Sequence, residues 1–214
     1  ARPDSQSMSG HRQCGLLFAA LLITACSRHD PDGDTVNLYE LVHQEGRWVL
    51  SSQEGVDVPF TGIAISHHPN ERVNQRTQFR SGRKHGRESF WYPNGRLRFQ
   101  GTYANGILEG SATHWHDNGQ KKREVTQRNG QPDGPERRWH RNGQVMLEAT
   151  WKQGRLFQAS SYRDNGEKTG VVEKGNGKLY SYYPNGDKKT EDTYGDGVRE
   201  GPALYWHENG RMAR

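Results

Sequence analysis

The sequence predicts an all-β protein, an elongated antiparallel repeat sheet built from β-hairpin units of about 24 residues. Three observations predict it: a pattern that returns at a nearly constant spacing, stretches in which apolar side chains alternate, and an unusual composition. Only 30% of the 214 residues are hydrophobic, yet 26 are Gly and 10% are aromatic. Such a chain lacks the aliphatic mass for the thick core of a large enzyme, and its aromatic content argues against disorder.

The first element is a segment with the features of a secretory signal. Met8 and Arg12 give a short positive start, and an uncharged apolar run follows that has about half of the ~20 residues a membrane-spanning helix needs. Ile23-Thr-Ala-Cys26 resembles the bacterial lipoprotein box, in which the Cys is acylated and becomes the new N-terminus. A plain signal peptide or a buried helix is the alternative. We therefore expect an upstream extension over residues 1–7, a lipoprotein signal peptide over 8–25 and lipidation at Cys26.

The residues around the lipidated Cys predict where the protein resides. Cys14 leaves with the signal, so the mature chain is expected to have no free thiol and no disulfide. If the cell is Gram-negative, Ser27 after the lipidated Cys favours the outer membrane. We therefore expect the protein in the bacterial cell envelope, on the periplasmic face of the outer membrane.

Residues 26–34 form a polar tether. Asp30, Asp32 and Asp34 alternate as in a calcium loop, but Thr35 and Leu41 stand where an EF-hand loop needs Gly and Glu. A solvated linker is therefore expected here rather than a calcium site. Residues 35–61 are predicted to supply N-terminal strands that cap the array, because the ends of a repeat protein need capping.

The repeat array, residues 62–214, is defined by the pattern aromatic-x-x-Asn-Gly. Its Asn positions step by 24, 24, 24, 23, 20 and 24 residues, with a worn first copy in which Glu71 replaces the turn Gly. Asn-Gly predicts a type I′ hairpin turn, because that turn needs positive φ at two residues. The aromatic residues of the six intact copies are Trp91, Trp115, Trp139, Tyr162, Tyr182 and Trp206.

Two further Gly positions keep step with this pattern. The first falls 12 residues after the Asn, as Gly106 does, and in the shortened unit we assign it to Gly177. The second falls five residues before the next aromatic residue, as Gly110 does. Between turns, Val145, Leu147 and Ala149 alternate with polar residues, which is the period of a strand. Each unit is therefore predicted to be two antiparallel strands, and seven units give about 14 strands.

Residues 58–211 resemble the variant MORN repeat of bacterial YwqK-type proteins. The resemblance rests on Pro59-Phe-Thr-Gly62, Trp91-Tyr-Pro-Asn-Gly95 and Tyr182-Tyr-Pro-Asn-Gly186. It implies the hairpin-repeat fold. Bacterial members are commonly described as antitoxin or immunity components, MORN proteins at large as membrane-associated scaffolds, and the bacterial variant brings no catalytic motif.

The repeated side chains offer candidate binding residues. The aromatic stripe is either a binding surface or, as we favour, the main source of buried area in a thin sheet. Basic clusters could favour anionic lipid, nucleic acid or an acidic partner, although a periplasmic protein meets no nucleic acid. We favour the plainer interpretation, a solvated face in which Glu109, Glu124, Glu136 and Glu148 interleave with the basic residues. The candidate binding residues are Trp91, Trp115, Trp139, Trp206, Lys121, Lys122, Arg137 and Arg138.

Metal binding and catalysis are not expected. His116, His140 and His207 share one repeat position, but like positions two strands apart lie ~10 Å from each other, too far to share a metal ion. The sequence has no Gly-x-Ser-x-Gly elbow and no phosphate loop. We therefore expect a binding protein rather than an enzyme, without a cofactor. Its expected partner is a cognate secreted toxin that it neutralises by occlusion, and the alternative is a structural or lipid-surface scaffold of the envelope.

Overall fold

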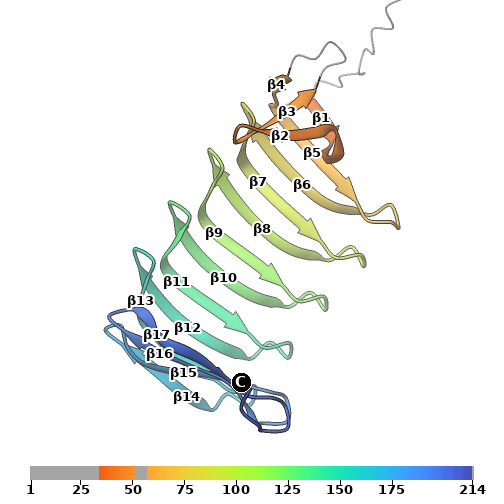
Figure 1. The fold of residues 1–214 in the computed structure, drawn as a ribbon. Coiled ribbons are helices and arrows are strands. Elements are labelled where there is room, and N and C mark those ends of the chain that lie inside the picture. The colour runs from red at the N-terminus through yellow and green to blue at the C-terminus, as the bar shows by residue number, and fades with distance from the viewer. Residues whose placement is uncertain (1–33, 52–56, 214) are drawn as a thin grey trace, which may run out of the picture.

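The structure, a computed structural model, describes residues 34–51 and 57–213. The expected signal peptide and Cys26 lie outside the described residues. Within them the fold is all-β apart from one short 3-10 turn, and the predicted sheet of antiparallel hairpin repeats is confirmed (Figure 1). None of the helical residues described forms a segment long and apolar enough to cross a membrane.

The main sheet has 14 strands that lie almost entirely in chain order, β1-β5-β6 and on to β17. All neighbours are antiparallel except β1, which pairs in parallel with β5. The strands are β1 (Asp34–Asn37), β5 (Gly62–His67), β6 (Val73–Arg80), β7 (Arg83–Trp91), β8 (Leu97–Ala104), β9 (Ile107–Trp115), β10 (Lys121–Arg128), β11 (Gln131–Trp139), β12 (Val145–Lys152), β13 (Arg155–Tyr162), β14 (Lys168–Glu173), β15 (Asn176–Tyr182), β16 (Lys188–Gly195) and β17 (Val198–Tyr205).

A second, three-stranded sheet precedes the repeats. It consists of β2 (Leu41–Gln44), β3 (Arg47–Ser51) and β4 (Asp57–Pro59), and the 3-10 turn η1 (Leu38–Glu40) connects it to β1. We call η1 and β2–β4 the N-terminal arm. It packs on one face of the main sheet through a buried cluster that includes Leu41, Phe60 and Phe79.

The two hairpin turns of each unit differ, and the type I′ prediction for the repeated Asn-Gly is wrong. At Pro93-Asn94-Gly95 only Gly95 has positive φ, +83°, and its N–H donates to Tyr92 O at 2.8 Å. This is a three-residue loop with Gly in the left-handed region. In the worn copy Glu71 takes that conformation itself, with φ +64°.

The type I′ geometry occurs instead in the turns at the opposite ends of the strands. Asn105 and Gly106 both have positive φ, 52° and 89°, as a two-residue loop of this type requires. In the shortened unit this turn is Lys174-Gly175, so the assignment of Gly177 as the turn Gly is wrong. Gly177 lies in β15 opposite Val172, five residues before Tyr182, and therefore occupies the third Gly position.

A β-bulge follows each Asn-Gly loop that leads into a further strand. Phe90 pairs with Phe99 and Trp91 with Leu97, so Arg98 is an extra residue; Lys122 and Met146 are extra in the same way 24 and 48 residues later. A bulge brings one more side chain to the strand and increases its twist. It therefore adds one side chain per unit along this edge of the array.

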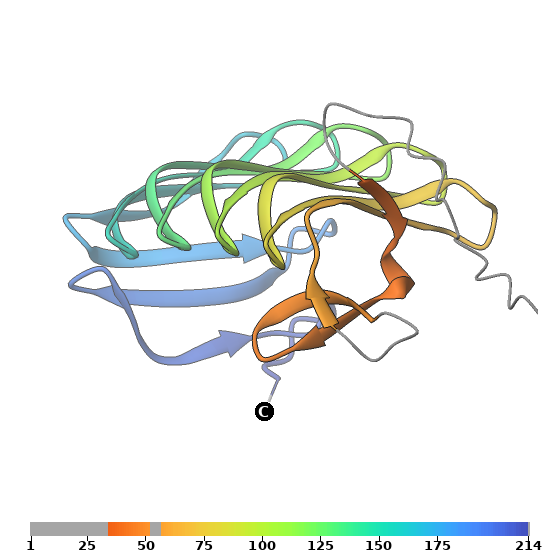
Figure 2. The same ribbon diagram turned by 90° about the horizontal axis from the view of Figure 1, so that it is seen from above.

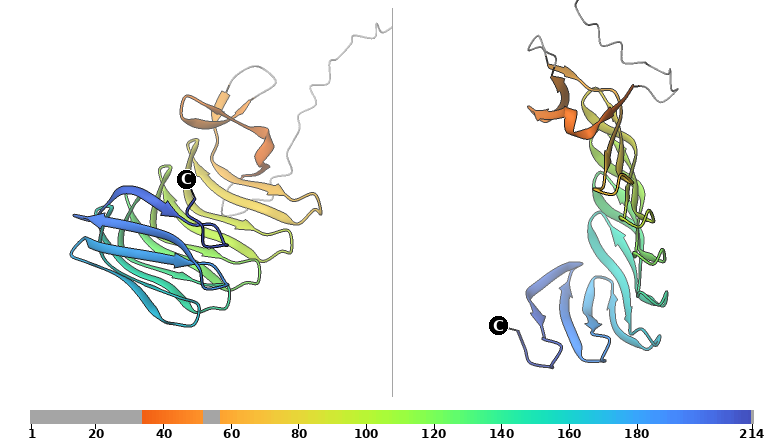
Figure 3. Two further views of the ribbon diagram at one scale, coloured as in Figure 1. Left: turned by 60° about the horizontal axis from the view of Figure 1, so that its bottom comes forward. Right: turned by 90° about the vertical axis from the view of Figure 1, so that its right-hand side faces the viewer.

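The long sheet bends so that the molecule has the outline of a C. Strands β14–β17, which we call the C-terminal arm, curl over the same face that the N-terminal arm covers (Figures 2 and 3). Leu147 and Leu156 pack there against Val172 and Leu179, with Trp151 beside them. Full burial of such side chains contributes roughly 1.5–3 kcal/mol each. We call the covered, concave face the inner face and the opposite one the outer face.

A candidate binding face on the inside of the curved sheet

A row of facing side chains runs across the inner face between the two arms. Successive pairs in the register join Phe90 to Phe99, Phe99 to His114, His114 to Arg123, and Arg123 to Arg138. The next pair joins Arg138 to Leu147 of the C-terminal core. Along the array the face therefore changes from aromatic to imidazole to guanidinium.

The aromatic part of the row is half-buried, and its rings are closely packed and tilted to one another. The ring centroids of Phe90 and Phe99 are 5.8 Å apart, and those of Phe99 and His114 are 4.8 Å apart. The exposed guanidinium of Arg98, the bulge residue of this unit, lies 5.2 Å from the Phe90 ring centroid. Such a contact orients a cation without neutralising its charge.

Glu136 organises the cationic part of the row. Its Oε1 accepts hydrogen bonds from the Nε of Arg123 at 2.7 Å and of Arg138 at 2.6 Å, and its Oε2 accepts one from Trp151 Nε1 at 2.7 Å. Burial alone would raise the pKa of Glu136, but the two guanidiniums outweigh it, so the pKa lies below its ordinary value. The expectation that Glu136 lies on a solvated face is wrong, because its side chain is fully buried.

Positive charge exceeds negative charge around this carboxylate. Lys122 and Arg98 are exposed, and among the described residues neither has an ion pair, whereas Arg123 and Arg138 share the single Glu136. His114 does not add to the charge: burial, then Arg123, Lys122 and Arg98, lower its pKa below 6.5.

Glu88 occupies the equivalent position of an earlier unit, 48 residues before Glu136, with a different set of partners. Its Oε1 accepts from Lys84 Nζ at 2.7 Å, Thr77 Oγ1 at 3.0 Å and Gln75 Nε2 at 3.1 Å. Burial, followed by the Glu88 charge, raises the pKa of the neighbouring Tyr103 to about 12. Here one carboxylate meets one cation, so the site is balanced.

Two adjoining cavities make the inner face accessible. One, of about 510 Å³, is lined by Phe99, His114 and Lys122, and the other, of about 670 Å³, by Lys122, Arg123 and Arg138. Asp164 also borders the larger cavity.

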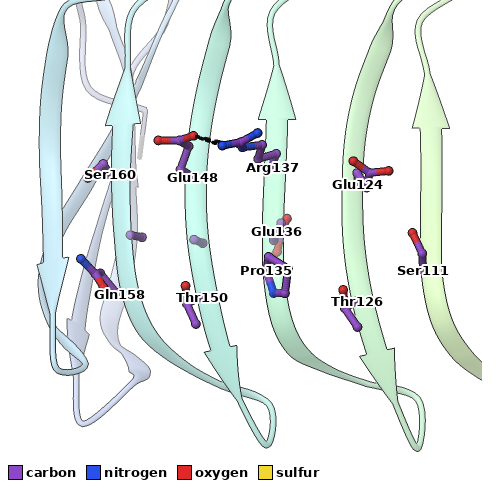
Figure 4. A pocket seen from close by; sticks show the side chains of 12 residues that line it. Ser111, Glu124, Thr126, Pro135, Glu136, Arg137, Glu148, Thr150, Gln158 and Ser160 are labelled. Carbon is purple, nitrogen blue, oxygen red and sulfur yellow. Dashed lines mark hydrogen bonds and ion pairs between the residues drawn. The ribbon is translucent and has the colours of Figure 1, made fainter.

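The outer face is polar, shallow and balanced in charge. Figure 4 shows short side chains there, including Thr126 and Thr150, in a depression of about 530 Å³. Arg137 Nη2 is 2.8 Å from Glu148 Oε1 on this face, and Lys121 Nζ is 3.1 Å from Glu124 Oε1.

The basic residues selected from the sequence therefore divide between the two faces. Arg138 and Lys122 line the inner cavities, whereas their immediate neighbours Arg137 and Lys121 form ion pairs with acidic residues of the outer face. Neighbours in a strand point to opposite faces, and the bulge at Lys122 adds its side chain to the inner side.

The selected aromatic residues lie in line, one per unit, beside the Asn-Gly loops, and Trp115 and Trp139 each line one of the two cavities. Trp91, Trp115, Trp139 and Trp206 are all half-buried, and Lys121 Nζ lies 5.8 Å from the Trp139 ring centroid. Their main-chain carbonyls hold the units together. The acceptors include Trp139 O, which receives His116 Nε2 at 3.1 Å.

Two kinds of side chain make repeated hydrogen bonds from one unit to the next. One is the residue that follows the repeated aromatic residue, and the other is the Asn of the Asn-Gly loop, whose contacts we call the Asn ladder. Asn118 Nδ2 donates to Arg141 O at 2.9 Å, while its Oδ1 accepts from the Gln120 N–H at 3.1 Å. His68, His116 and His140 contact the main-chain carbonyl of the next unit's aromatic residue, as Tyr92 does when it donates to Trp115 O at 2.8 Å. Within the described ranges no group of three or more His, Cys, Asp or Glu residues is placed to hold a metal ion.

Sequence reasoning missed Arg98, His114 and Arg123 as members of the inner face, and Glu136 as its organiser. A signal was available in the repeat itself. Positions 75, 99, 123 and 147 are equivalent, and they read Gln, Phe, Arg and Leu. Position 123 is charged where its equivalents are neutral, which sets it apart from residues that the fold alone requires.

The open, single-layer sheet of hairpin units, with its recurring Asn-Gly loops, defines a repeat protein whose long face is available for binding. The chain matches the family described as MORN repeat variant over residues 84–105, 108–129, 132–153 and 176–196. It therefore belongs to the MORN repeat variant family. No curated protein matches the chain significantly.

Proposed function

We propose that this protein is a lipid-anchored binding protein of the bacterial envelope that neutralises a cognate secreted toxin or effector by direct occlusion. The observation that carries the proposal is the inner face: an open row of aromatic and cationic side chains with more positive than negative charge, framed by two arms. The envelope location rests on the lipoprotein-like sequence that ends at Cys26.

The composition of this face suits a protein partner. Stable protein interfaces cover about 800 Å² per partner and depend on a few anchors, which are enriched in Trp, Tyr and Arg. Phe90, Phe99, Arg123 and Arg138 provide aromatic and Arg anchors within a single row. Occlusion requires no chemistry from the protein itself, in keeping with our proposal that it is not an enzyme.

The alternative is a structural or lipid-surface scaffold of the envelope. The excess cations are the feature that favours it, because anionic headgroups attract basic surfaces. The arms count against it, since they project from the same face as the cations (Figure 3). A flat bilayer would meet the arms before it met Arg123 or Arg138.

Rescue from toxicity tests the proposed function. The product of the gene beside this one is directed to the periplasm of a host cell, with and without co-expression of this protein. Survival only with this protein, together with a complex of the two in solution, is the expected result. Unchanged killing by a folded, co-localised pair contradicts the proposal, as does the absence of a toxin-like neighbouring gene in several genomes.

The anchor is tested separately with Cys26→Ala. We expect the variant to move from the membrane fraction to the soluble periplasmic fraction, while its affinity for the partner in solution is unchanged. A variant that still partitions to membranes would show that Cys26 is not the anchor.

A further inference from the structure

We infer that the facing pair Arg123 and Arg138 is a carboxylate-binding site that receives an acidic side chain from a protruding segment of the partner protein. The inference rests on the proposed function, because it assumes that the inner face meets a protein. It goes further by naming the residues that bind and the chemistry that they recognise.

The Arg123–Arg138 pair departs from the repeat pattern. In the same row Ser66 faces Gln75 and Phe90 faces Phe99, so a neutral or aromatic pair satisfies the fold at this position. Arg123 facing Arg138 is different, because directly opposite like charges destabilise a sheet. A binding role explains why the array carries such a pair.

Arg123 and Arg138 have more hydrogen-bond donors than Glu136 uses. Each guanidinium has five N–H donors, and each reaches Glu136 through Nε. The Arg123 and Arg138 side chains keep 32% and 38% of their surface exposed, whereas Glu136 has none exposed. The buried carboxylate therefore holds the two guanidiniums through their Nε atoms. Their solvent-exposed N–H groups remain accessible to a planar acceptor such as a carboxylate.

Positive charge around the Arg123–Arg138 pair exceeds negative charge. Glu136 offsets only one of the two guanidinium charges, and Lys122 and Arg98 add two more cations along the same face. The other acidic groups that border these two cavities are Glu88, which is paired with Lys84, and Asp164 at the rim. Asp192 lines a neighbouring cavity together with Arg138 and is paired with Arg199. The uncompensated charge favours an anion in front of the pair.

The position of the site favours a protein segment over a lipid surface. Arg138 faces Leu147, which packs beneath the C-terminal arm, and the N-terminal arm closes the other end of the row. A loop or strand with acidic side chains can enter between the arms. A vesicle surface cannot do so without displacing one of them.

The probe is a capped hexaglutamate peptide, whose binding to the folded protein is measured by calorimetry at low salt. Lys122→Gln is the primary variant, since Lys122 is exposed and has no ion pair among the described residues, so the fold should be retained. Lys121→Gln is its matched control on the outer face. We expect Lys122→Gln to weaken binding about three- to tenfold, and Lys121→Gln by less than twofold.

Arg138→Gln and Arg138→Lys test the pair itself, with Arg137→Gln as the neighbouring control. We expect a loss of about tenfold or more for Arg138→Gln and a smaller loss for Arg138→Lys, which keeps the charge but not the fork. Circular dichroism confirms that each variant is folded. Equal losses in inner-face and outer-face variants would overturn the inference, because they would indicate non-specific attraction.

Two further comparisons distinguish a protein carboxylate from a lipid headgroup as the ligand, and distinguish failure of the site from failure of the proposed function. Wild-type protein that binds phosphatidylglycerol vesicles more tightly than hexaglutamate, with the same dependence on Arg138, would refute a protein segment as the ligand. If Arg138-dependent hexaglutamate binding is found but no toxin is neutralised, the proposed function fails and the site stands. If the toxin is neutralised equally by wild type and Arg138→Gln, the site fails and the proposed function stands.

Discussion

Glu136→Gln is the perturbation that most directly tests the organisation of the inner face. The substitution keeps the shape of the side chain but removes the charge that faces Arg123 and Arg138. The amide of Gln has a single acceptor oxygen, whereas both carboxylate oxygens of Glu136 accept hydrogen bonds. If that oxygen stays with the two Arg residues, the NH₂ group of Gln faces the Trp151 N–H, donor against donor. Two guanidiniums would then face each other without a counter-charge.

The size of the effect follows from burial. Removing one partner of a buried ion pair costs about 3–5 kcal/mol, and the Arg residues are about a third exposed, so we expect the lower end, about 3 kcal/mol. In a chain of this length each kcal/mol shifts Tm by about 2–4 °C, which gives a decrease of about 6–12 °C. The decrease is measured by circular dichroism, and hydrogen exchange should locate the loss of protection in β10–β12.

Glu148→Gln is the matched control. Glu148 pairs with Arg137 on the outer face, where both side chains are more than 40% exposed, and such a pair contributes about 0–1 kcal/mol. Glu136→Gln should therefore lower Tm several times more than Glu148→Gln. Equal shifts would refute the conclusion that Glu136 organises the face.

The pH dependence gives a second readout of the same carboxylate. The pKa of Glu136 in the folded protein is lowered, so its contribution to stability is fully present above the ordinary carboxyl range and is lost as the pH falls through the folded pKa. Between neutral pH and that range, wild type should exceed Glu136→Gln by a constant margin. The two stability curves should then converge in acid, and a margin that widened in acid would contradict the sign of the shift.

Three further results are expected. Asn118→Ala loses one bond to Arg141 O and one within its own loop, so it should cost about 1–2 kcal/mol in chemical denaturation, whereas a loss near zero would show that the ladder is not stabilising. Gly177→Ala places a Cβ against Val171 O at φ +143°, so it should destabilise the fold by at least about 1–3 kcal/mol, and a stable variant would contradict the assignment of this strand. NMR titration should give His114 a pKa below 6.5 that rises when hexaglutamate binds, and an unchanged pKa would place the anion away from this face.

The period of the sequence was enough to predict the hairpin units, because turn Gly residues and alternating strands are local properties. The repeats supply 13 strands, β5–β17, where about 14 were predicted, and the fourteenth strand of the sheet is β1, which precedes the array. The limits of the period are visible in the turns. Asn94 was predicted to take part in a type I′ turn, but its side chain bonds across to Asp117 O of the next unit and to the Arg96 N–H of its own loop. The cross-unit contact requires knowledge of how the units stack.

The candidate binding face was harder to predict for a related reason. Arg137 and Arg138 are neighbours in the sequence, and composition treats them alike. The register sends Arg137 to a solvent-exposed pair with Glu148, and Arg138 to a buried carboxylate. Charge clusters therefore say little about a thin sheet until each residue is assigned to one of its two faces.

The bulge after each loop connects repetition with specificity. It adds one side chain to each unit at the edge of the inner face, and hydrogen bonds of the Asn ladder maintain the stacking beside it. These added positions carry Arg98, Lys122 and Met146 in successive units. Because the main chain is held by groups common to all units, the bulge residue is free to vary without loss of the fold. An array built in this way can change the chemistry of its inner face one unit at a time. In this protein the added positions bring Arg98 and Lys122 to the face that carries the Arg123–Arg138 pair.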